Sequence, residues 1–209
     1  MSSHAAAGPG VPRRIGLFGG SFDPPHRAHR ALADLALAQL RLDQLRWLPA
    51  GQPWQKAART LAPRVDRLAM LRLLMAGEPR FALDERELER TGPSYTIDTV
   101  RELAAEHRGA ELLLVIGQDQ YGRFDTWREW PELLQRVTLA VAGRDGAAPT
   151  PPPALAAQSH RLVALPLPAM PVSSTQIRAA AAQGLRVDAL AGPAVAGYIA
   201  DHQLYTGKA

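Results

Sequence analysis

Apolar residues along the chain follow two alternating patterns. Short apolar segments that predict strands occur at residues 14–18, 44–48, 81–83, 111–117, 137–142 and 161–165. Segments with apolar residues at helical spacing lie between and after them, at 28–40, 65–75, 97–106, 130–135, 174–183 and 193–202. The segment 111–117, ELLLVIG, is a continuous apolar run closed by glycine, which is typical of a fully buried parallel strand.

This alternation predicts βαβ crossovers, and hence an α/β fold: a Rossmann-like, doubly wound, mostly parallel sheet with helices on both faces. Residues 50–62 and 145–157 are predicted loops, rich in proline with glycine or alanine. We expect a disordered tail over 1–12 and a single domain over 13–209. Ligands of such sheets bind beyond the carboxyl ends of the strands, so we expect sites at 19–29, 117–127 and 173–178.

Composition and charge narrow the function classes. Hydrophobic residues make up 46% of the chain, and no apolar run approaches the length of a membrane span. There is no cysteine, which excludes disulfides and thiolate chemistry. The net charge is +4, carried almost entirely by scattered arginines, which favours a small anionic ligand over nucleic acid. We predict a cytoplasmic protein without membrane or nucleic-acid partners; the sequence leaves a homo-oligomer open.

The run GLFGGSFDPPHRAH, residues 16–29, follows the first predicted strand. Gly19 and Gly20 allow close approach of backbone to a ligand, and two prolines delay the next helix. His26 and His29 then lie at or beside the first helical turn, where free N–H groups favour an anion. The run fits neither a dinucleotide fingerprint nor a P-loop. Structural histidines or metal ligands remain alternatives, although no third ligand stands nearby.

A second motif, PVSSTQIRAA, covers residues 171–180. Ser173 and Gln176 form a capping box, so the motif can be read as a well-capped helix. The same geometry lets the hydroxyls of Ser174 and Thr175, free N–H groups and Arg178 form an oxyanion cradle.

Together the two motifs resemble those of the nucleotidyltransferase superfamily, H-x-G-H and S-S-T-x-I-R. Ala28 stands where that superfamily usually has glycine, while both histidines are intact. The resemblance implies His26, His29 and Arg178 as catalytic residues. It implies the following ATP-binding residues: Gly19, Gly20, Ser21, Phe22, Gly117, Asp119, Ser173, Ser174, Thr175 and Arg178.

The middle of the chain resembles bacterial nicotinate-nucleotide adenylyltransferases in ERTGPSYTIDTV (89–100), VIGQDQYGRFDTWREWPELL (115–134) and LPAGQPWQK (48–56). By this resemblance the nicotinate nucleotide is bound by four residues: Lys56, Thr96, Trp127 and Arg128. Thr96 and the amide of Arg128 would hold the carboxylate while Trp127 stacks on the ring. From the residues alone, Thr96 also reads as a helix cap, Trp127 as core, Asp119 as a turn residue and Lys56 as a solvated loop residue.

The reaction implied is adenylyl transfer from ATP to nicotinate mononucleotide, giving nicotinate adenine dinucleotide and pyrophosphate in NAD biosynthesis. Mg²⁺ would be carried on the ATP phosphates, with no metal site in the protein. A sibling acting on nicotinamide mononucleotide or another phosphate, a non-catalytic nucleotide- or RNA-binding domain, and a dinucleotide-dependent oxidoreductase are the alternatives. The alternating charges of Glu85, Arg86, Glu87, Glu89 and Arg90 predict a solvated face.

Overall fold

The computed structural model describes residues 13–51 and 61–206. The predicted tail at 1–12 and most of the predicted loop at 50–62 lie outside these residues. Within the described part of the chain, no helix is long and apolar enough to cross a membrane.

Six parallel strands form one sheet in the order β3-β2-β1-β4-β5-β6. Their bounds are Arg14–Gly20 (β1), Gln44–Pro49 (β2), Phe81–Leu83 (β3), Glu111–Gly117 (β4), Val137–Ala142 (β5) and Leu162–Leu165 (β6). This order is that of a doubly wound sheet, in which the chain builds outward from β1 and then, in the other direction, from β4. The predicted fold class is confirmed.

Alternate side chains of the strands face two separate apolar cores. One core joins Leu113 and Val115 of β4 to helices α1 (Arg27–Gln39) and α2 (Arg64–Met75). The other joins Leu112, Leu114 and Ile116 to α4 (Thr96–Glu106) and α6 (Trp130–Arg136). Burial on both faces explains why β4 is apolar at every central position.

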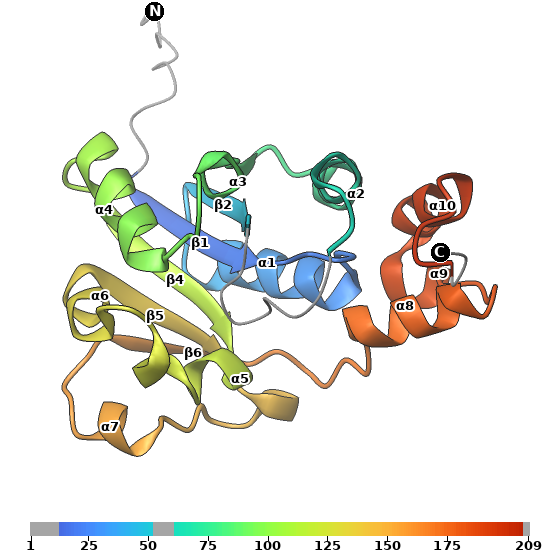
Figure 1. The fold of residues 1–209 in the computed structure, drawn as a ribbon. Coiled ribbons are helices and arrows are strands. Elements are labelled where there is room, and N and C mark those ends of the chain that lie inside the picture. Colours follow the sequence, from blue (N-terminus) through green and yellow to red (C-terminus); the bar gives the residue numbers. More distant parts are fainter. Residues whose placement is uncertain (1–12, 52–60, 207–209) are drawn as a thin grey trace, which may run out of the picture.

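A third core lies at the C-terminal end of the chain. Helices α8 (Ser174–Ala182), α9 (Asp188–Ala191) and α10 (Pro193–Asp201) pack with one another and against Met70 of α2. Figure 1 shows these helices gathered beside α2, at the far end of the molecule from α4 and α6. The C-terminal helices therefore cover a helix and not a face of the sheet.

Several short helices lie where the sequence pattern predicts no helix. They are α3 (Arg86–Glu89), α5 (Gln118–Tyr121), α7 (Pro153–Ala156) and α9, with 3-10 turns η2 (Phe124–Thr126) and η3 (Arg144–Gly146). A helix of one turn is too short to show a hydrophobic period, because periodicity needs at least two turns to be recognised. The predicted loop at 145–157 therefore contains α7.

The charged run at 85–90 is not the solvated face that its alternation predicts. The buried Asp84 carboxylate accepts from Arg46 at 2.8 Å and from Arg86 at 2.9 Å. The buried Thr99 hydroxyl donates to Glu87 and accepts from Arg90. Burial raises the pKa of Glu87. Glu89 is exposed, but the prediction was wrong for Arg86, Glu87 and Arg90, because they meet partners on α4 that are distant in sequence. Asp84 beside them pairs with Arg46 of β2.

Two buried charged residues join the loop after β1 to the rest of the molecule. Arg67 of α2 is 3% exposed and Asp23 is 1% exposed. The Arg67 guanidinium donates to three carbonyl oxygens, those of Ser21, Ala50 and Ala62. One carboxylate oxygen of Asp23 accepts from the Tyr205 hydroxyl at 2.7 Å and from the Ala62 amide at 3.2 Å. The loop after β1 is thus fixed from both α2 and the C-terminal end.

Replacing Tyr205 by phenylalanine removes a donor from a buried carboxylate. We expect the Tyr205→Phe variant to lose about 1–3 kcal/mol of unfolding free energy, measured by urea denaturation at pH 7. Tyr198→Phe is the matched control, because the Tyr198 hydroxyl donates to the half-buried Asp66 at 2.9 Å and the change is chemically the same. Equal losses of unfolding free energy in the two variants would show that the burial of Asp23 does not strengthen its hydrogen bond with Tyr205.

Candidate active site

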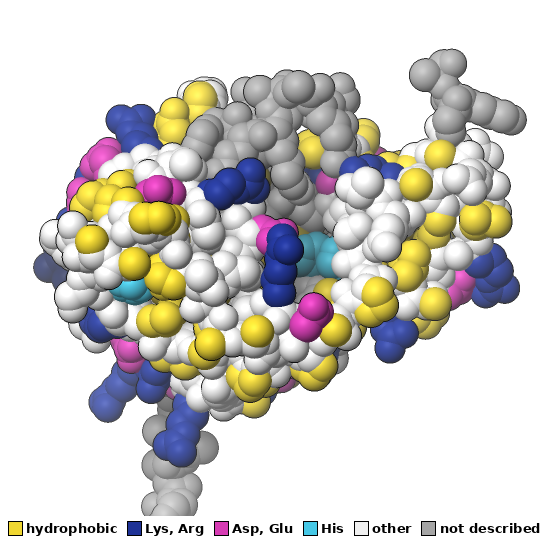
Figure 2. Space-filling model, turned by 90° about the horizontal axis from the view of Figure 1, so that it is seen from below, with side chains coloured by type: hydrophobic (Ala, Val, Ile, Leu, Met, Phe, Trp, Pro, Cys, Tyr) yellow, Lys and Arg dark blue, Asp and Glu magenta, His cyan; other side chains and the backbone are white. Residues whose placement is uncertain are grey.

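A cavity of about 570 Å³ opens at the carboxyl ends of β1 and β4, where the chain reverses its winding direction. Figure 2 shows this face hollowed at its centre, with histidine at the floor of the hollow and charged side chains at its edge. Most residues predicted for the site line this cavity: Gly19, Gly20, Ser21, Phe22, His26, His29, Thr96, Gly117, Asp119, Trp127, Arg128 and Ser174. Ser173, Thr175 and Arg178 are not among the lining residues, and Lys56 lies outside the described part of the chain.

The two histidines stand together at the start of α1. Their rings stack with centroids 3.7 Å apart. The backbone N–H of His26 donates to Nδ1 of His29 at 3.2 Å, so the ring hydrogen of His29 is on Nε2. Phe22 packs edge-on against His29 and holds that ring from the other side. The pair is therefore fixed as two adjacent imidazoles at the cavity wall, as their three-residue spacing predicts.

His26 is only 7% exposed, and its Nδ1 has no hydrogen-bond partner among the residues that the structure describes. Burial lowers the pKa of His26 to about 4, so the ring is neutral near pH 7. A buried ring nitrogen without a partner is costly in a fold that serves stability alone. The unpartnered ring nitrogen therefore indicates that a bound ligand supplies the missing hydrogen bond.

Two glycines face the cavity at positions where packing does not require glycine. A Cβ at Gly117 would have no heavy atom within 4 Å, and one at Gly19 would meet only the Leu48 carbonyl oxygen at 3.9 Å. Gly20 differs, since a Cβ there would lie 3.0 Å from the Phe22 ring. Open space beside backbone at the ends of β1 and β4 allows a ligand to approach the main chain closely.

The second motif is joined directly to the loop that carries the first. Ser173 caps α8 by accepting from the Gln176 amide at 3.2 Å, which confirms the predicted capping. The Ser174 hydroxyl donates to the Pro24 carbonyl at 2.8 Å. Arg178 donates to the Asp23 carbonyl at 2.7 Å and to the Thr175 hydroxyl at 3.1 Å. The first turn of α8 is thereby held against the loop between β1 and α1.

The opposite wall of the cavity comes from α4 and from the turn before α6. Thr96 is the first residue of α4, and Tyr95 is its N-cap. Trp127 is half-buried and stacks on Phe124 with ring centroids 5.0 Å apart. The guanidinium carbon of Arg128 lies 4.6 Å from the centre of the Tyr95 ring. Trp127 therefore has a core contact on one side and also lines the cavity.

Asp119 is exposed and paired with Arg144, whose guanidinium is 2.6 Å away. Both residues line the cavity and also a shallower depression of about 640 Å³ that continues from it. A Cβ at Gly143 would lie 1.8 Å from the Ala147 carbonyl oxygen. Only glycine lets the chain fold back there and bring Arg144 to Asp119.

The cavity-lining residues that were not predicted include four polar ones: Tyr95, Arg144, Gln118 and Glu87. Tyr95 and Gln118 lie directly beside predicted residues, so adjacency to the motifs is the signal that could have found them. Arg144 follows a buried strand at the same sheet edge, which is also recognisable from sequence. Glu87 carries no such signal, because its place depends on the packing of α3 against α4.

The described residues contain no group of three or more His, Asp or Glu side chains arranged to hold a metal ion. Asp23, the carboxylate in the first motif, is engaged inside the fold with Tyr205 and Ala62. The donors that do face the cavity are neutral imidazole, hydroxyl and backbone N–H groups, with arginines at its edge. Such a set suits a ligand with several phosphates and a flat ring.

Comparison with known proteins agrees with this geometry. A family model for cytidylyltransferase-like proteins matches residues 17–180, which include both motifs. A protein of Methylibium petroleiphilum named as a probable nicotinate-nucleotide adenylyltransferase is 55% identical over 197 residues, with 92% of each chain covered. One of the same name from Bordetella petrii is 48% identical and is matched over 92% of this chain and 99% of its own.

Among solved structures, the nicotinic acid mononucleotide adenylyltransferase of Plasmodium falciparum, complexed with NaAD, superposes with a TM-score of 0.77. The match covers 92% of this chain and 97% of that one at 16% sequence identity, so it bears on the fold. The family model and the bacterial relatives decide the family. The chain belongs to the cytidylyltransferase-like family and, within it, to the nicotinate-nucleotide adenylyltransferases.

Proposed function

We propose that this protein transfers the adenylyl group of ATP to nicotinate mononucleotide, releasing pyrophosphate and forming nicotinate adenine dinucleotide for NAD biosynthesis. One observation carries the proposal: a single cavity has paired imidazoles and the start of α8 on one wall, and Thr96, Trp127 and Arg128 on the other. The first wall suits a polyphosphate and the second a charged aromatic ring. The sequence relatives named for this activity support the same substrate.

The ATP phosphates would lie along the loop after β1 and the start of α8. Backbone N–H groups at 19–22 and 173–175 supply donors, and Arg178 and the imidazoles add directed ones. Gly117 would admit the adenosine moiety, with Asp119 accepting from a ribose hydroxyl. Arg178 already binds the Asp23 carbonyl, so it also positions the loop that it would share with the phosphates. Ala28 lines this wall, and its methyl group would help set the triphosphate position.

Nicotinate mononucleotide would occupy the second wall. The ring stacks on Trp127, whose other face is held by Phe124. The carboxylate would accept from the backbone N–H of Thr96, which the first turn of α4 leaves unused, and from that of Arg128 in the turn before α6. The 5′-phosphate would face the α-phosphorus of ATP, with Lys56 as its expected partner.

In the reaction an oxygen of the nicotinate nucleotide phosphate bonds to the α-phosphorus, and the bond from that phosphorus to the pyrophosphate oxygen breaks. The nucleophile is already an anion at neutral pH, so no general base is assigned. The residues align two mutually repelling phosphates and donate hydrogen bonds to the charge that develops on the leaving pyrophosphate. His26, being neutral at pH 7, would act as a hydrogen-bond donor and not as a full cation.

ATP would enter as its Mg²⁺ complex, with the ion held by phosphate oxygens and water. The carboxylate of the first motif, Asp23, is turned into the fold, which supports a metal carried by the substrate. A cytoplasmic location is likewise a prediction.

The deciding experiment measures pyrophosphate release from ATP and Mg²⁺ with either nicotinate or nicotinamide mononucleotide. We expect turnover with the acid and a kcat/KM at least tenfold lower with the amide, because helix N-terminal donors favour an anion. Equal use of both would retain adenylyl transfer and remove the carboxylate site. Absence of release with either would favour a nucleotide-binding domain without this activity.

Replacing His29 by alanine removes a donor directed at the reacting phosphates. We expect the fold to remain and kcat to fall by roughly two orders of magnitude, about 3 kcal/mol of transition-state stabilisation. His202→Ala is the matched control, since His202 stacks on Tyr198 with centroids 4.0 Å apart and does not line the cavity. Near-normal kcat in a pure, folded His29→Ala sample would refute the role.

The depressed pKa of His26 makes the folded state sensitive to acid. The unfolded chain takes up a proton near pH 6.5 and the folded chain only near pH 4, so stability is complete above pH 6.5 and falls as the pH drops toward 4. This group accounts for about 3 kcal/mol of that loss. Urea titrations between pH 4 and 7.5 should give a flatter profile for His26→Gln than for the native chain; parallel profiles would contradict the assignment.

A further inference from the structure

The side chain of Arg128 has a defined place at the mouth of the cavity. Its guanidinium lies over the face of Tyr95, 4.6 Å from the ring centre, and both residues line the cavity with Trp127. Tyr95 directly precedes Thr96, whose amide is one of the two proposed carboxylate donors. The cation is therefore held by the same wall to which the nicotinate ring would bind.

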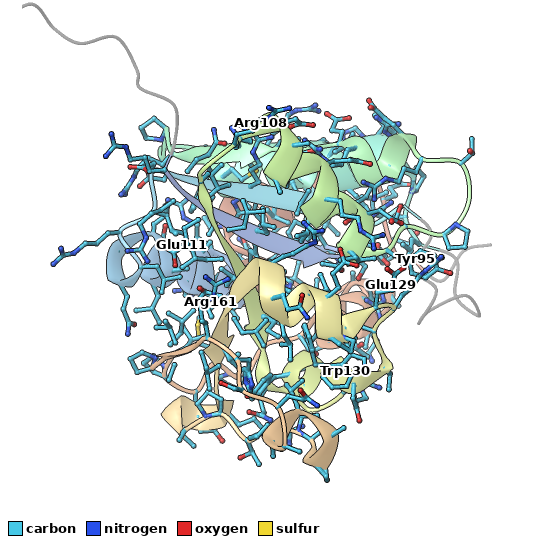
Figure 3. The ribbon with its side chains drawn as sticks, turned by 90° about the vertical axis from the view of Figure 1, so that its left-hand side faces the viewer. Tyr95, Arg108, Glu111, Glu129, Trp130 and Arg161 are labelled. Carbon is cyan, nitrogen blue, oxygen red and sulfur yellow. The ribbon has the colours of Figure 1, made fainter. Side chains whose placement is uncertain are left out.

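An acidic residue stands next to this cation. Glu129 Oε1 lies 3.3 Å from Arg128 Nε, and the other Glu129 oxygen is bound by Arg101 of α4. Arg101 is also bound by Glu132 of α6. Figure 3 labels both residues: Tyr95 lies directly before α4 and Glu129 directly before α6. The backbone at Glu129 has a positive φ of 52°, which residues other than glycine rarely adopt. The ion pairs of its side chain hold Glu129 in this conformation.

The two proposed backbone donors supply only part of the discrimination between the acid and the amide. An N–H group donates to a carboxylate oxygen and also to the carbonyl oxygen of a neutral amide. A fixed cation nearby changes this balance, because it attracts the charged carboxylate more strongly than the neutral amide. Arg128 is placed to supply that cation, and Glu129 is placed to offset part of it.

We infer that the Arg128 guanidinium, held on Tyr95 and partly offset by Glu129, sets how strongly the cavity prefers a pyridine nucleotide with a carboxylate over one with an amide. This inference rests on the proposed function and deepens it. Arg128 acts through its side-chain charge, in addition to the backbone amide that any residue there provides. Its side chain is 56% exposed, so water and salt screen the interaction and the effect is moderate.

The test compares kcat and KM for nicotinate and nicotinamide mononucleotides in the native chain and four variants. Arg128→Gln removes the side-chain charge and keeps the backbone N–H at position 128. Arg128→Lys keeps a positive charge there. Glu129→Gln removes the negative charge that partly neutralises Arg128. Arg136→Gln is the matched control: Arg136 pairs with Glu132 on α6 and does not line the cavity. Thermal unfolding of each variant verifies that it is folded.

We expect Arg128→Gln to lower the acid-to-amide ratio of kcat/KM by about three- to tenfold, through a higher KM for the acid, with kcat little changed. Glu129→Gln should raise the ratio by about two- to threefold, while Arg128→Lys keeps most of it and Arg136→Gln all of it. Added salt should lower the ratio in the native chain and leave it level in Arg128→Gln.

The outcomes separate this inference from the function on which it rests. If the native chain prefers the acid and Arg128→Gln does so equally, the inference is overturned and the function stands. If Arg128→Lys falls as far as Arg128→Gln, the guanidinium acts by shape and the charge assignment is overturned. If the native chain releases no pyrophosphate, or uses acid and amide alike, the proposed carboxylate site itself fails.

Discussion

The site depends on the point where the parallel sheet changes its direction of winding. From β1 the chain passes to α1 on one face, and from β4 it passes to α5 and α6 on the other. Two connections that leave adjacent strands toward opposite faces cannot pack against each other, so a crevice remains at the carboxyl ends. The rest of the site lines the two edges of this crevice. The paired imidazoles lie on one side, and the start of α4 with Trp127 lies on the other.

The side of that crevice proposed to bind phosphates is held in place by distant parts of the chain. The loop between β1 and α1 has little regular hydrogen bonding of its own, and it is held by α2 through Arg67 and by the C-terminal end through Tyr205 and Arg178. Because the third core joins α8 and α10 to α2, these tethers belong to one packed unit. The C-terminal helices, which touch no face of the sheet, thus fix the geometry of the proposed phosphate site.

Charge is distributed unevenly around the cavity. The groups at its floor are neutral donors, since burial keeps His26 uncharged, whereas the cations lie near the rim and each has an acidic neighbour: Arg144 with Asp119, and Arg128 with Glu129. A neutral floor avoids the cost of burying a charge when no ligand is bound. When an anionic substrate binds, a cation at the rim can give up part of its interaction with its acidic neighbour and interact with the substrate instead.

The sequence by itself determined the alternation of strands and helices, the strand ends at which the cavity opens, and both motifs, because each is a local pattern of apolar spacing, glycine, proline or capping residues. It also placed Thr96 and Trp127 on the ring side by resemblance. Only the tertiary structure decided that Asp84 and the charges after it join β2 and α4, that Tyr205 reaches Asp23, and that Arg128 lies on Tyr95. These contacts join residues with no common period or motif, and burial is what makes them necessary: a polar group removed from water must find a partner wherever the fold brings one.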